Sequence, residues 1–355
     1  MQNKSTLIVV NARFVTQELS GVQRFASEIA LKLKFLFDDI VFVSPKDIIQ
    51  QDLAKSLSVK TDLPFSFLKG HLWEQISLPF YLASQKFKTL LISLCNTGPI
   101  LIRSQIYTLH DIGFKIYPQW YSKFFSKVYN IMVPILLKKS SHIITVSETS
   151  KSRIANAFKI DKRKISVVYN AVDFRPKRIK AKSKLVGNQY ILSVSSFNPR
   201  KNLKKLIEAF ILLDDDNMYL YLVGKFNKNF QIEEFENHQR ILFLSDISDD
   251  TLIDLYDNAS LFVNSSFYEG FGIPILEAMK FNLNICASDI NSFNEIFENS
   301  ILYFDPTSIK SIKESIEKGL KLPVKSNDYD TILDKYTWDN SAEKLRKIII
   351  KILDK

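Results

Sequence analysis

The sequence predicts an α/β protein that is built from two doubly wound domains. The chain has 355 residues, whereas a single hydrophobic core usually stops growing at about 250–300 residues. Short apolar runs alternate with longer amphipathic stretches, which is typical of parallel sheets whose strands are joined by helices. The alternation stops at a basic, polar stretch around residues 178–188 and then begins again, which indicates two domains.

The first domain is expected at residues 1–175. Its predicted strands are Thr6–Val10, Ile40–Val43, Leu90–Leu94, Ile106–Leu109, His142–Val146 and Ile165–Val168. Its predicted helices include Gly21–Phe37, Trp120–Lys138 and Glu148–Phe158. Pro134 should kink or end the second of these helices, because proline removes a helical hydrogen bond and clashes with the preceding turn.

A linker is expected at residues 176–189 and the second domain at residues 190–337. The predicted strands of this domain are Tyr190–Val194, Met218–Val223, Ile241–Leu244, Leu261–Val263, Leu283–Ala287 and Ile301–Phe304. Its predicted helices include Leu203–Leu212, Asp249–Asn258 and Pro274–Lys280. The last segment, residues 338–355, contains an amphipathic helix without a partner strand, and we expect this helix to cross the junction between the domains.

The positive charge of the chain is concentrated in the first domain. Residues 1–175 contain 24 lysines and arginines against 12 acidic residues, and residues 176–355 contain 24 against 26. This imbalance indicates an anionic partner, which is a nucleic acid, an acidic lipid or a phosphorylated substrate. The alternative is a lysine-rich composition that serves solubility alone.

The cysteines and the apolar runs indicate the cellular compartment. Cys95 and Cys286 lie in apolar segments of different halves, so a disulfide framework is not expected and a reducing cytoplasm fits. No uninterrupted apolar run reaches the ~18 residues of a membrane-spanning helix. The apolar run after Thr6 is also too short for the core of a signal peptide.

The segment from Ser266 to Met279 combines a strand end, a glycine-bearing loop and a helix start at Pro274. A helix N-terminus presents backbone N–H groups and partial positive charge, which suits a diphosphate. Gly272 allows the backbone to approach such a ligand closely, and the carboxylates of Glu269 and Glu277 can accept hydrogen bonds from sugar hydroxyls. The alternative is an ordinary helix start with a surface glutamate.

The segment from Leu192 to Leu203 places Arg200 and Lys201 before a helix that we expect to be capped near Asn202. Cations are unfavourable at a helix N-terminus, so the pair is expected to serve an anionic ligand. Arginine grips phosphate oxygens in a bidentate manner and lysine acts as a point charge. The alternative is a solvated basic turn.

Other polar segments are less specific. His110 follows a predicted strand and precedes Asp111, so it is either a polar site or a structural histidine. The aromatic and lysine residues of 115–139 fit either a core-facing helix or a membrane interface. We interpret the acidic run at residues 214–216 as a solvated turn, and no histidine or cysteine spacing predicts a metal site.

These segments together resemble the retaining family 4 glycosyltransferases, which have the GT-B fold of two Rossmann-like domains facing across a cleft. Glu269 and Glu277 match the Glu–seven–Glu signature of that family. The resemblance implies that Glu269 contacts the donor sugar and Glu277 the ribose. It also implies that the N–H groups of Phe271, Gly272 and Ile273 face the sugar and diphosphate.

The same resemblance extends to the other segments. It implies that Arg200 and Lys201 stabilise the leaving nucleotide diphosphate and that His110 lies against the donor sugar. Ser196 lies in a donor-binding loop where the family often has glycine. Gly21 is the one glycine left of a family loop that faces the diphosphate and the acceptor.

The resemblance therefore predicts transfer of a hexosyl or deoxyhexosyl group, mannose or rhamnose, with retention of configuration and without a metal or another cofactor. The donor would be GDP-mannose or dTDP-rhamnose. The acceptor would be an O-antigen or capsule glycan on a polyprenyl diphosphate, at the inner face of the cytoplasmic membrane.

The basic first domain would contact that membrane from the cytoplasm. A nonhydrolysing sugar-nucleotide epimerase of GT-B fold and a basic nucleic-acid-binding protein are the alternatives. The sequence shows no nucleic-acid recognition motif, and we expect no nucleic-acid partner.

Overall fold

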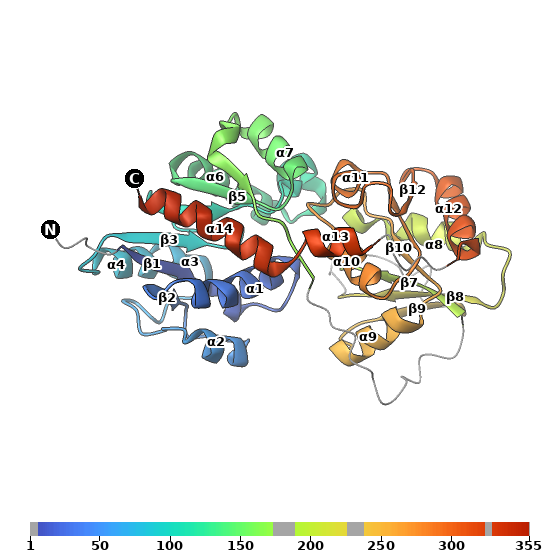
Figure 1. The fold of residues 1–355 in the computed structure, drawn as a ribbon, viewed down its shortest axis with the longest axis horizontal. Coiled ribbons are helices and arrows are strands. Elements are labelled where there is room, and N and C mark those ends of the chain that lie inside the picture. The colour runs from blue at the N-terminus through green and yellow to red at the C-terminus, as the bar shows by residue number, and fades with distance from the viewer. Residues whose placement is uncertain (1–5, 173–188, 226–237, 324–328, 355) are drawn as a thin grey trace. The chain divides into compact units, whose positions relative to one another are not determined.

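The computed structural model describes residues 6–172, 189–225, 238–323 and 329–354 (Figure 1). The chain forms two compact units. The first comprises the described residues up to Ala171 together with those from Tyr336 onward, and the second runs from Val172 to Lys335. The predicted linker at residues 176–189 lies outside the described residues, except for Gln189, which begins a strand.

In the described part of the first unit, six parallel strands form one sheet in the order β2-β1-β3-β4-β5-β6. The strands are β1 (Leu7–Asn11), β2 (Ile40–Val43), β3 (Thr89–Ser93), β4 (Gln105–Thr108), β5 (His142–Thr145) and β6 (Ile165–Val167). The apolar runs of the sequence predicted all six within one residue at each end, because strands covered on both faces are almost continuously apolar.

The helices of the first unit include several that the sequence did not predict. They are α1 (Gly21–Leu36), α2 (Gln51–Leu57), α3 (Gly70–Gln75), α4 (Ser77–Ala83), α5 (Gly113–Ile116), α6 (Lys123–Lys139), α7 (Glu148–Phe158) and α14 (Trp338–Leu353). Short 3₁₀ turns lie at η1 (Arg13–Thr16), η2 (Pro118–Trp120) and η3 (Lys162–Lys164). Helix α6 continues through Pro134, so this proline does not end the helix, and the predicted kink stays a prediction.

Three of the six aromatic side chains of the 115–139 stretch face the protein core. Tyr121, Phe125 and Tyr129 pack against a cluster that contains the buried Val133 of α6. Phe124, on the same helix, is exposed. The structure therefore favours the core-facing interpretation of this stretch over the membrane interface.

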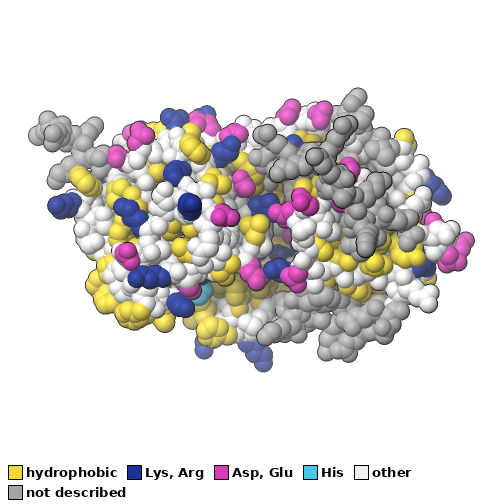
Figure 2. Space-filling model, turned by 90° about the horizontal axis from the view of Figure 1, so that it is seen from below, with side chains coloured by type: hydrophobic (Ala, Val, Ile, Leu, Met, Phe, Trp, Pro, Cys, Tyr) yellow, Lys and Arg dark blue, Asp and Glu magenta, His cyan; other side chains and the backbone are white. Residues whose placement is uncertain are grey.

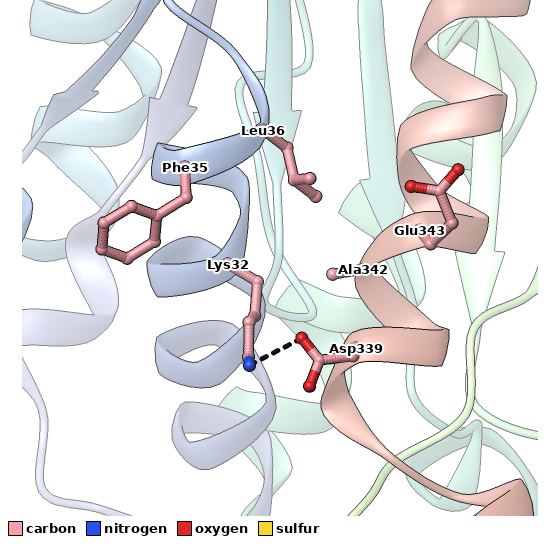
Figure 3. Close-up of a pocket in the computed structure, with 6 residues that line it drawn as sticks. All are labelled: Lys32, Phe35, Leu36, Asp339, Ala342 and Glu343. Carbon is pink, nitrogen blue, oxygen red and sulfur yellow. Dashed lines mark ion pairs between the residues drawn. The ribbon is translucent and has the colours of Figure 1, made fainter.

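Helix α14 packs against α1 within the first unit. The rings of Trp338 and Phe25 lie 6.1 Å apart, and Lys32 forms an ion pair of 2.7 Å with Asp339. Figure 3 shows the open pocket of about 360 Å³ between these helices, which is lined by Lys32, Phe35, Leu36, Asp339, Ala342 and Glu343. None of the predicted site residues lines it, and the predicted crossing of the domain junction stays a prediction.

In the described part of the second unit, another six parallel strands have the order β12-β11-β10-β7-β8-β9. These strands are β7 (Gln189–Val194), β8 (Met218–Val223), β9 (Ile241–Leu244), β10 (Leu261–Asn264), β11 (Ile285–Ser288) and β12 (Leu302–Phe304). The helices are α8 (Leu203–Ile211), α9 (Asp249–Asn258), α10 (Ile273–Lys280), α11 (Asn291–Phe297), α12 (Ile309–Lys321) and α13 (Asp330–Lys335), with a 3₁₀ turn η4 (Pro199–Lys201).

Each sheet has one point at which the strand order reverses. In the first sheet the chain leaves β1 toward β2 and leaves β3 toward β4, so the reversal lies between β1 and β3. In the second sheet it lies between β7 and β10. Ligands of open α/β sheets bind beyond the carboxyl ends of the strands at such points.

The acidic run at 214–216 precedes β8, so it lies at the amino ends of the strands and away from the switch point. It is largely exposed, as predicted for a solvated turn.

Candidate active site

Two predicted segments meet at the switch point of the second sheet. The first follows β7 and carries η4, and the second follows β10. The backbone N–H of Phe267 donates to the carbonyl of Arg200 at 2.9 Å, and the hydroxyl of Ser265 donates to the carbonyl of Lys201 at 2.9 Å. These bonds join segments more than 60 residues apart and bring the predicted cations beside the predicted glutamate loop.

Lys201 and Glu269 form a buried ion pair at this point. The ammonium of Lys201 donates to Oε1 of Glu269, and the hydroxyl of Ser266 donates to the same oxygen at 2.8 Å. Each charged side chain is only about one tenth exposed. Burial raises the pKa of Glu269, but the charges of Lys201 and Arg200 and the two hydrogen bonds outweigh it, so the pKa lies below its usual value.

The cations lie on the 3₁₀ turn η4 and not in a longer helix. The side chain of Asn198 accepts a hydrogen bond from the N–H of Arg200 at 3.1 Å and so caps the turn. Asn202 follows in the left-handed region, with φ of 55°, and its amide donates to the carbonyl of Pro306 at 2.8 Å. Asn202 therefore occupies the N-cap position of α8, where the sequence predicted the cap, and its side chain makes no capping hydrogen bond.

Gly224, directly after β8, fixes the path of the loop that contains Ser195 and Ser196. A Cβ at this position would lie 1.7 Å from the carbonyl oxygen of Ser195, a distance that no side chain tolerates. The hydroxyl of Ser196 accepts a hydrogen bond from the amide of Asn198 at 2.8 Å, and Ser196 is exposed. The loop thus lies open beside the cations.

Gly272 is the N-cap of α10, which begins at Ile273 with Pro274 in its first turn. Its φ of 119° is inaccessible to ordinary side chains, and a Cβ would lie 2.7 Å from the ring of Phe293. Phe271 is buried in front of it. The first turn of a helix leaves N–H groups without intrahelical partners, so the start of α10 is suited to an anion.

Glu277 lies one turn into α10 and is also buried. Its Oε2 accepts a hydrogen bond of 2.9 Å from the hydroxyl of Tyr256, which belongs to α9. The ring of Tyr256 stacks on that of Phe281 at 5.5 Å. The sequence did not predict a role for Tyr256, because this residue lies 21 residues from Glu277 and no local pattern links the two.

His110 belongs to the first unit and follows β4. Its Nε2 lies 3.1 Å from the carbonyl oxygen of Leu94, and its backbone N–H donates to Oδ1 of Asn96 at 2.8 Å. Burial lowers the pKa of His110 to about 4, so the ring is neutral at physiological pH. A carbonyl oxygen only accepts, so Nε2 carries the proton and the lone pair belongs to Nδ1.

A second buried ion pair lies at the switch point of the first sheet. Nε of Arg13 is 3.5 Å from Oε1 of Glu74, and that oxygen accepts hydrogen bonds from Asn11 at 2.7 Å and from Thr97 at 3.2 Å. Burial raises the pKa of Glu74, but Arg13 together with the hydrogen bonds of His71 and Asn11 lowers it overall. No local sequence pattern predicted either partner of this ion pair.

This cluster borders a small polar pocket beside the start of α1, where Gly21 is the first helical residue. The pocket has a volume of about 140 Å³, and its lining includes Arg13, Gln17, Gln23, Asn96, Thr97 and Tyr129. Asn96 also holds the backbone of His110. Amide and hydroxyl groups thus dominate a pocket whose cation is paired with Glu74.

The described residues show neither a metal cluster nor a membrane-spanning helix. Among them, no three histidine, cysteine, aspartate or glutamate side chains are grouped closely enough to hold a metal ion. Within the same residues, no helix combines the length and the apolarity needed to cross a bilayer.

Solved structures share this architecture. Sucrose-phosphate synthase from Thermosynechococcus elongatus matches 99% of this chain with 100% of its own, at 15% identity and a TM-score of 0.76. Alr3699/HepE from Anabaena, solved in complex with UDP-glucose, matches 98% of this chain with 99% of its own, at 17% identity and a TM-score of 0.72. The two parallel sheets and these neighbours define the fold as GT-B.

Sequence comparison identifies the family. A family model described as "Glycosyltransferase Family 4" matches residues 19–175, and one described as "Glycosyl transferases group 1" matches residues 175–335. The O-antigen chain mannosyltransferase RfbU of Salmonella typhimurium is 32% identical over 264 residues, which are 72% of each chain. O-antigen chain mannosyltransferase B of Escherichia coli is 28% identical over 63% of each chain. The chain belongs to glycosyltransferase family 4.

Proposed function

We propose that this glycosyltransferase moves a mannosyl or rhamnosyl group from a nucleotide diphosphate sugar to a hydroxyl of a growing surface glycan. The observation that carries this proposal is the buried Lys201–Glu269 pair, which lies at the switch point of the second sheet in the loops that flank β7 and β10. The mannosyltransferase names of the similar proteins favour GDP-mannose over dTDP-rhamnose as the donor.

The cations would act on the leaving diphosphate. When the bond from the anomeric carbon to the diphosphate oxygen breaks, negative charge grows on that oxygen. Arg200, Lys201 and the N-terminus of α10 offset this charge without moving, because hydrogen bonds already hold η4 and its neighbours. Removal of one such preorganised donor typically costs about 2.7–4 kcal/mol of transition-state stabilisation.

The two glutamates would hold sugar hydroxyls. The lowered pKa of Glu269 keeps this side chain ionised at neutral pH, so it accepts hydrogen bonds and does not donate a proton. Glu277, oriented by Tyr256, would accept hydrogen bonds from the ribose. Glu269 therefore positions the donor sugar and does not act as a general acid.

His110 and the polar pocket of the first unit would serve the sugars as well. The lone pair on Nδ1 of the neutral His110 suits a hydroxyl donor and not an anion. The amide and hydroxyl lining of the pocket suits the uncharged hydroxyls of an acceptor sugar, since Glu74 compensates the charge of Arg13. The variant Gln23→Ala should accordingly raise KM for the acceptor and leave KM for the donor unchanged.

Retention of configuration, independence of metals and a polyprenyl-diphosphate-linked acceptor complete the proposal. They rest on the family membership and on the resemblance of the glutamate segment. The acceptor would be met at the inner face of the cytoplasmic membrane, where the enzyme would be a peripheral protein.

A panel of nucleotide diphosphates and nucleotide sugars, tested by thermal shift with EDTA present, identifies the donor. We expect a rise in melting temperature with one nucleotide, followed by transfer only when an acceptor glycan is added. Consumption of the donor without an acceptor would indicate the epimerase, and salt-sensitive binding of DNA or RNA would indicate the nucleic-acid-binding alternative. Full transfer activity in Glu269→Ala would contradict the site.

A further inference from the structure

Exposed apolar side chains gather on one short stretch of the first unit. They are Phe65, Phe67, Leu72, Ile76 and Phe80, which are between 37% and 76% exposed, and we call them the Phe65–Phe80 patch. Figure 2 shows hydrophobic side chains gathered at the lower left of the view, on the first unit. Large exposed patches of this kind mark interaction sites on soluble proteins.

The members of the patch form one continuous surface. The N–H of Ile76 donates to the carbonyl of Leu72 at 3.0 Å, and the N–H of Phe80 donates to the carbonyl of Ile76 at 3.2 Å. These three side chains therefore follow one another at i, i+4 and i+8 along α3 and α4. The ring of Phe65 lies 5.1 Å from that of Phe80 and 6.4 Å from that of Phe67, so the preceding loop extends the same stripe.

The backbone holds Phe65 on this surface at a conformational cost. Its φ of 57° lies in the left-handed region, which is a genuine outlier for a bulky aromatic residue. Its carbonyl accepts hydrogen bonds from the buried hydroxyl of Ser77 and from the N–H of Leu68, each at 3.0 Å. Strain of this kind persists where the surroundings enforce it and is concentrated at functional sites.

The exposed charges next to the patch are mostly positive. Asp62, three residues before Phe65, is exposed and forms an ion pair of 3.3 Å with Lys46. From Leu63 to Lys88, a stretch that the structure describes throughout, the exposed charged residues are Lys69, Lys86 and Lys88. The one acidic residue in this stretch, Glu74, is buried and paired with Arg13. Aromatic rings interspersed with lysines are typical of protein surfaces that lie in the headgroup region of a bilayer.

We infer that the Phe65–Phe80 patch docks on an anionic lipid bilayer, with the rings inserted among the headgroups and the lysines against lipid phosphates. The side chains protrude from two short helices and a loop, a shape that suits a soft, flat lipid surface. Each lysine near the surface adds about fivefold to the affinity for anionic lipids. The inference deepens the proposed function, because a lipid-linked acceptor is met at a membrane.

The test is sedimentation of the full chain with vesicles, without donor or acceptor. Vesicles of phosphatidylcholine alone are compared with vesicles that also contain phosphatidylglycerol. We expect binding to the anionic vesicles that weakens with salt. The double variant Phe67→Ser/Leu72→Ser should lose about tenfold in affinity for each side chain, and Lys69→Glu at least about fivefold.

Matched variants control for exposed phenylalanine and for charge. Phe35→Ser removes an 83% exposed phenylalanine from α1, and Lys55→Glu reverses an exposed lysine on α2, and both should bind as the unchanged chain does. Phe124→Ser tests the aromatic stretch of α6 as the rival surface. The melting temperature and transfer to a water-soluble acceptor should stay unchanged in all these variants.

Three outcomes would overturn the inference. Equal binding by the Phe67→Ser/Leu72→Ser variant and the unchanged chain would remove the patch from the contact, as would loss of binding in Phe124→Ser instead. If the unchanged chain does not bind anionic vesicles but forms dimers, and the double variant is monomeric, the patch is a contact between two copies of this chain. Failure of vesicle binding alongside normal sugar transfer would leave the proposed function standing.

Discussion

Replacement of Lys201 by methionine tests the role of the buried ion pair most directly. Both charged groups of the pair are about one tenth exposed, and loss of one partner from such a pair costs about 3–5 kcal/mol because the other charge stays buried. Arg200 and the hydroxyl of Ser266 still stabilise the charge of Glu269 in the variant. We therefore expect the free energy of unfolding to fall by about 3 kcal/mol, the lower end of that range.

The loss of unfolding free energy in Lys201→Met should depend on pH in a defined direction. The folded pKa of Glu269 lies below its unfolded value, so the pair stabilises the fold above the unfolded pKa, and this stability is lost as the pH falls through the folded pKa. Lys201→Met removes the charge and one of the hydrogen bonds that lower the pKa of Glu269, so this pKa rises relative to that in the unchanged chain. The difference in stability between the variant and the unchanged chain should therefore shrink as the pH falls below the ordinary pKa of 4.5 toward the folded pKa of Glu269.

The measurement separates the two units. Trp73, Trp120 and Trp338 all belong to the first unit, so tryptophan fluorescence reports that unit and circular dichroism must follow the second. Lys313→Met is the control, since it removes the lysine of the partly exposed Lys313–Glu317 pair on α12 and should cost below about 1 kcal/mol.

The double variant Lys201→Met/Glu269→Gln distinguishes stability from catalysis. It removes both charges, so it should recover part of the stability lost in Lys201→Met. Transfer should stay about 10²–10³-fold slower, because the cation that we propose to act on the diphosphate is still absent. A double variant with normal kcat, or a Lys201→Met chain that loses less than about 1 kcal/mol, would refute the reasoning.

The other predictions concern single positions. Gly224→Ala should lower the melting temperature by about 5 °C and weaken donor binding, because the new methyl group would meet the carbonyl of Ser195, and an unchanged affinity in calorimetry would argue against this. Tyr256→Phe should raise KM for the donor by at least about tenfold, since it removes the hydrogen bond to Glu277, and equal kinetics would show that the hydroxyl is dispensable. The buried ring of His110, with its pKa of about 4, stays neutral at pH 5 while the unfolded chain takes up a proton, so the unchanged chain is about 2 kcal/mol less stable at pH 5 than near pH 7. His110→Phe should remove this decrease. An unchanged pH dependence of the unfolding free energy in urea titrations would contradict this. EDTA should leave the rate of transfer unchanged, whereas a rate restored only by Mg²⁺ or Mn²⁺ would refute metal independence.

The regular elements follow from local patterns in the sequence. Strands such as β8 and β9 and helices such as α7 and α9 have the predicted bounds, because apolar runs and amphipathic spacing are local signals. The helices α3 and α4 were missed, since each spans fewer than two full turns and their exposed apolar residues obscure the amphipathic pattern. Pro134 was expected to kink or end α6, but the helix does not end there, because a packed helix tolerates a missing hydrogen bond.

The site could be predicted only where a segment carries its own signal. The glycine loop around Glu269 and the basic turn around Lys201 are such segments, although nothing local shows that these two side chains pair across 68 residues. Arg13 and Glu74 have no signal of this kind. Their pairing depends on the strand order that brings the end of β1 next to β3, which the sequence pattern does not specify.

The position of α14 has a consequence for the order of folding during synthesis. This helix packs on α1, and Ser341 donates a hydrogen bond to the carbonyl of Tyr169, yet the whole second unit is translated between these parts. Until residues 336–355 have been synthesised and have left the ribosome, the apolar face of α1 around Phe25 lacks its cover. The second unit can therefore fold while the first is incomplete, and a stop codon shortly before Trp338 should expose the nascent first unit to chaperones and proteases.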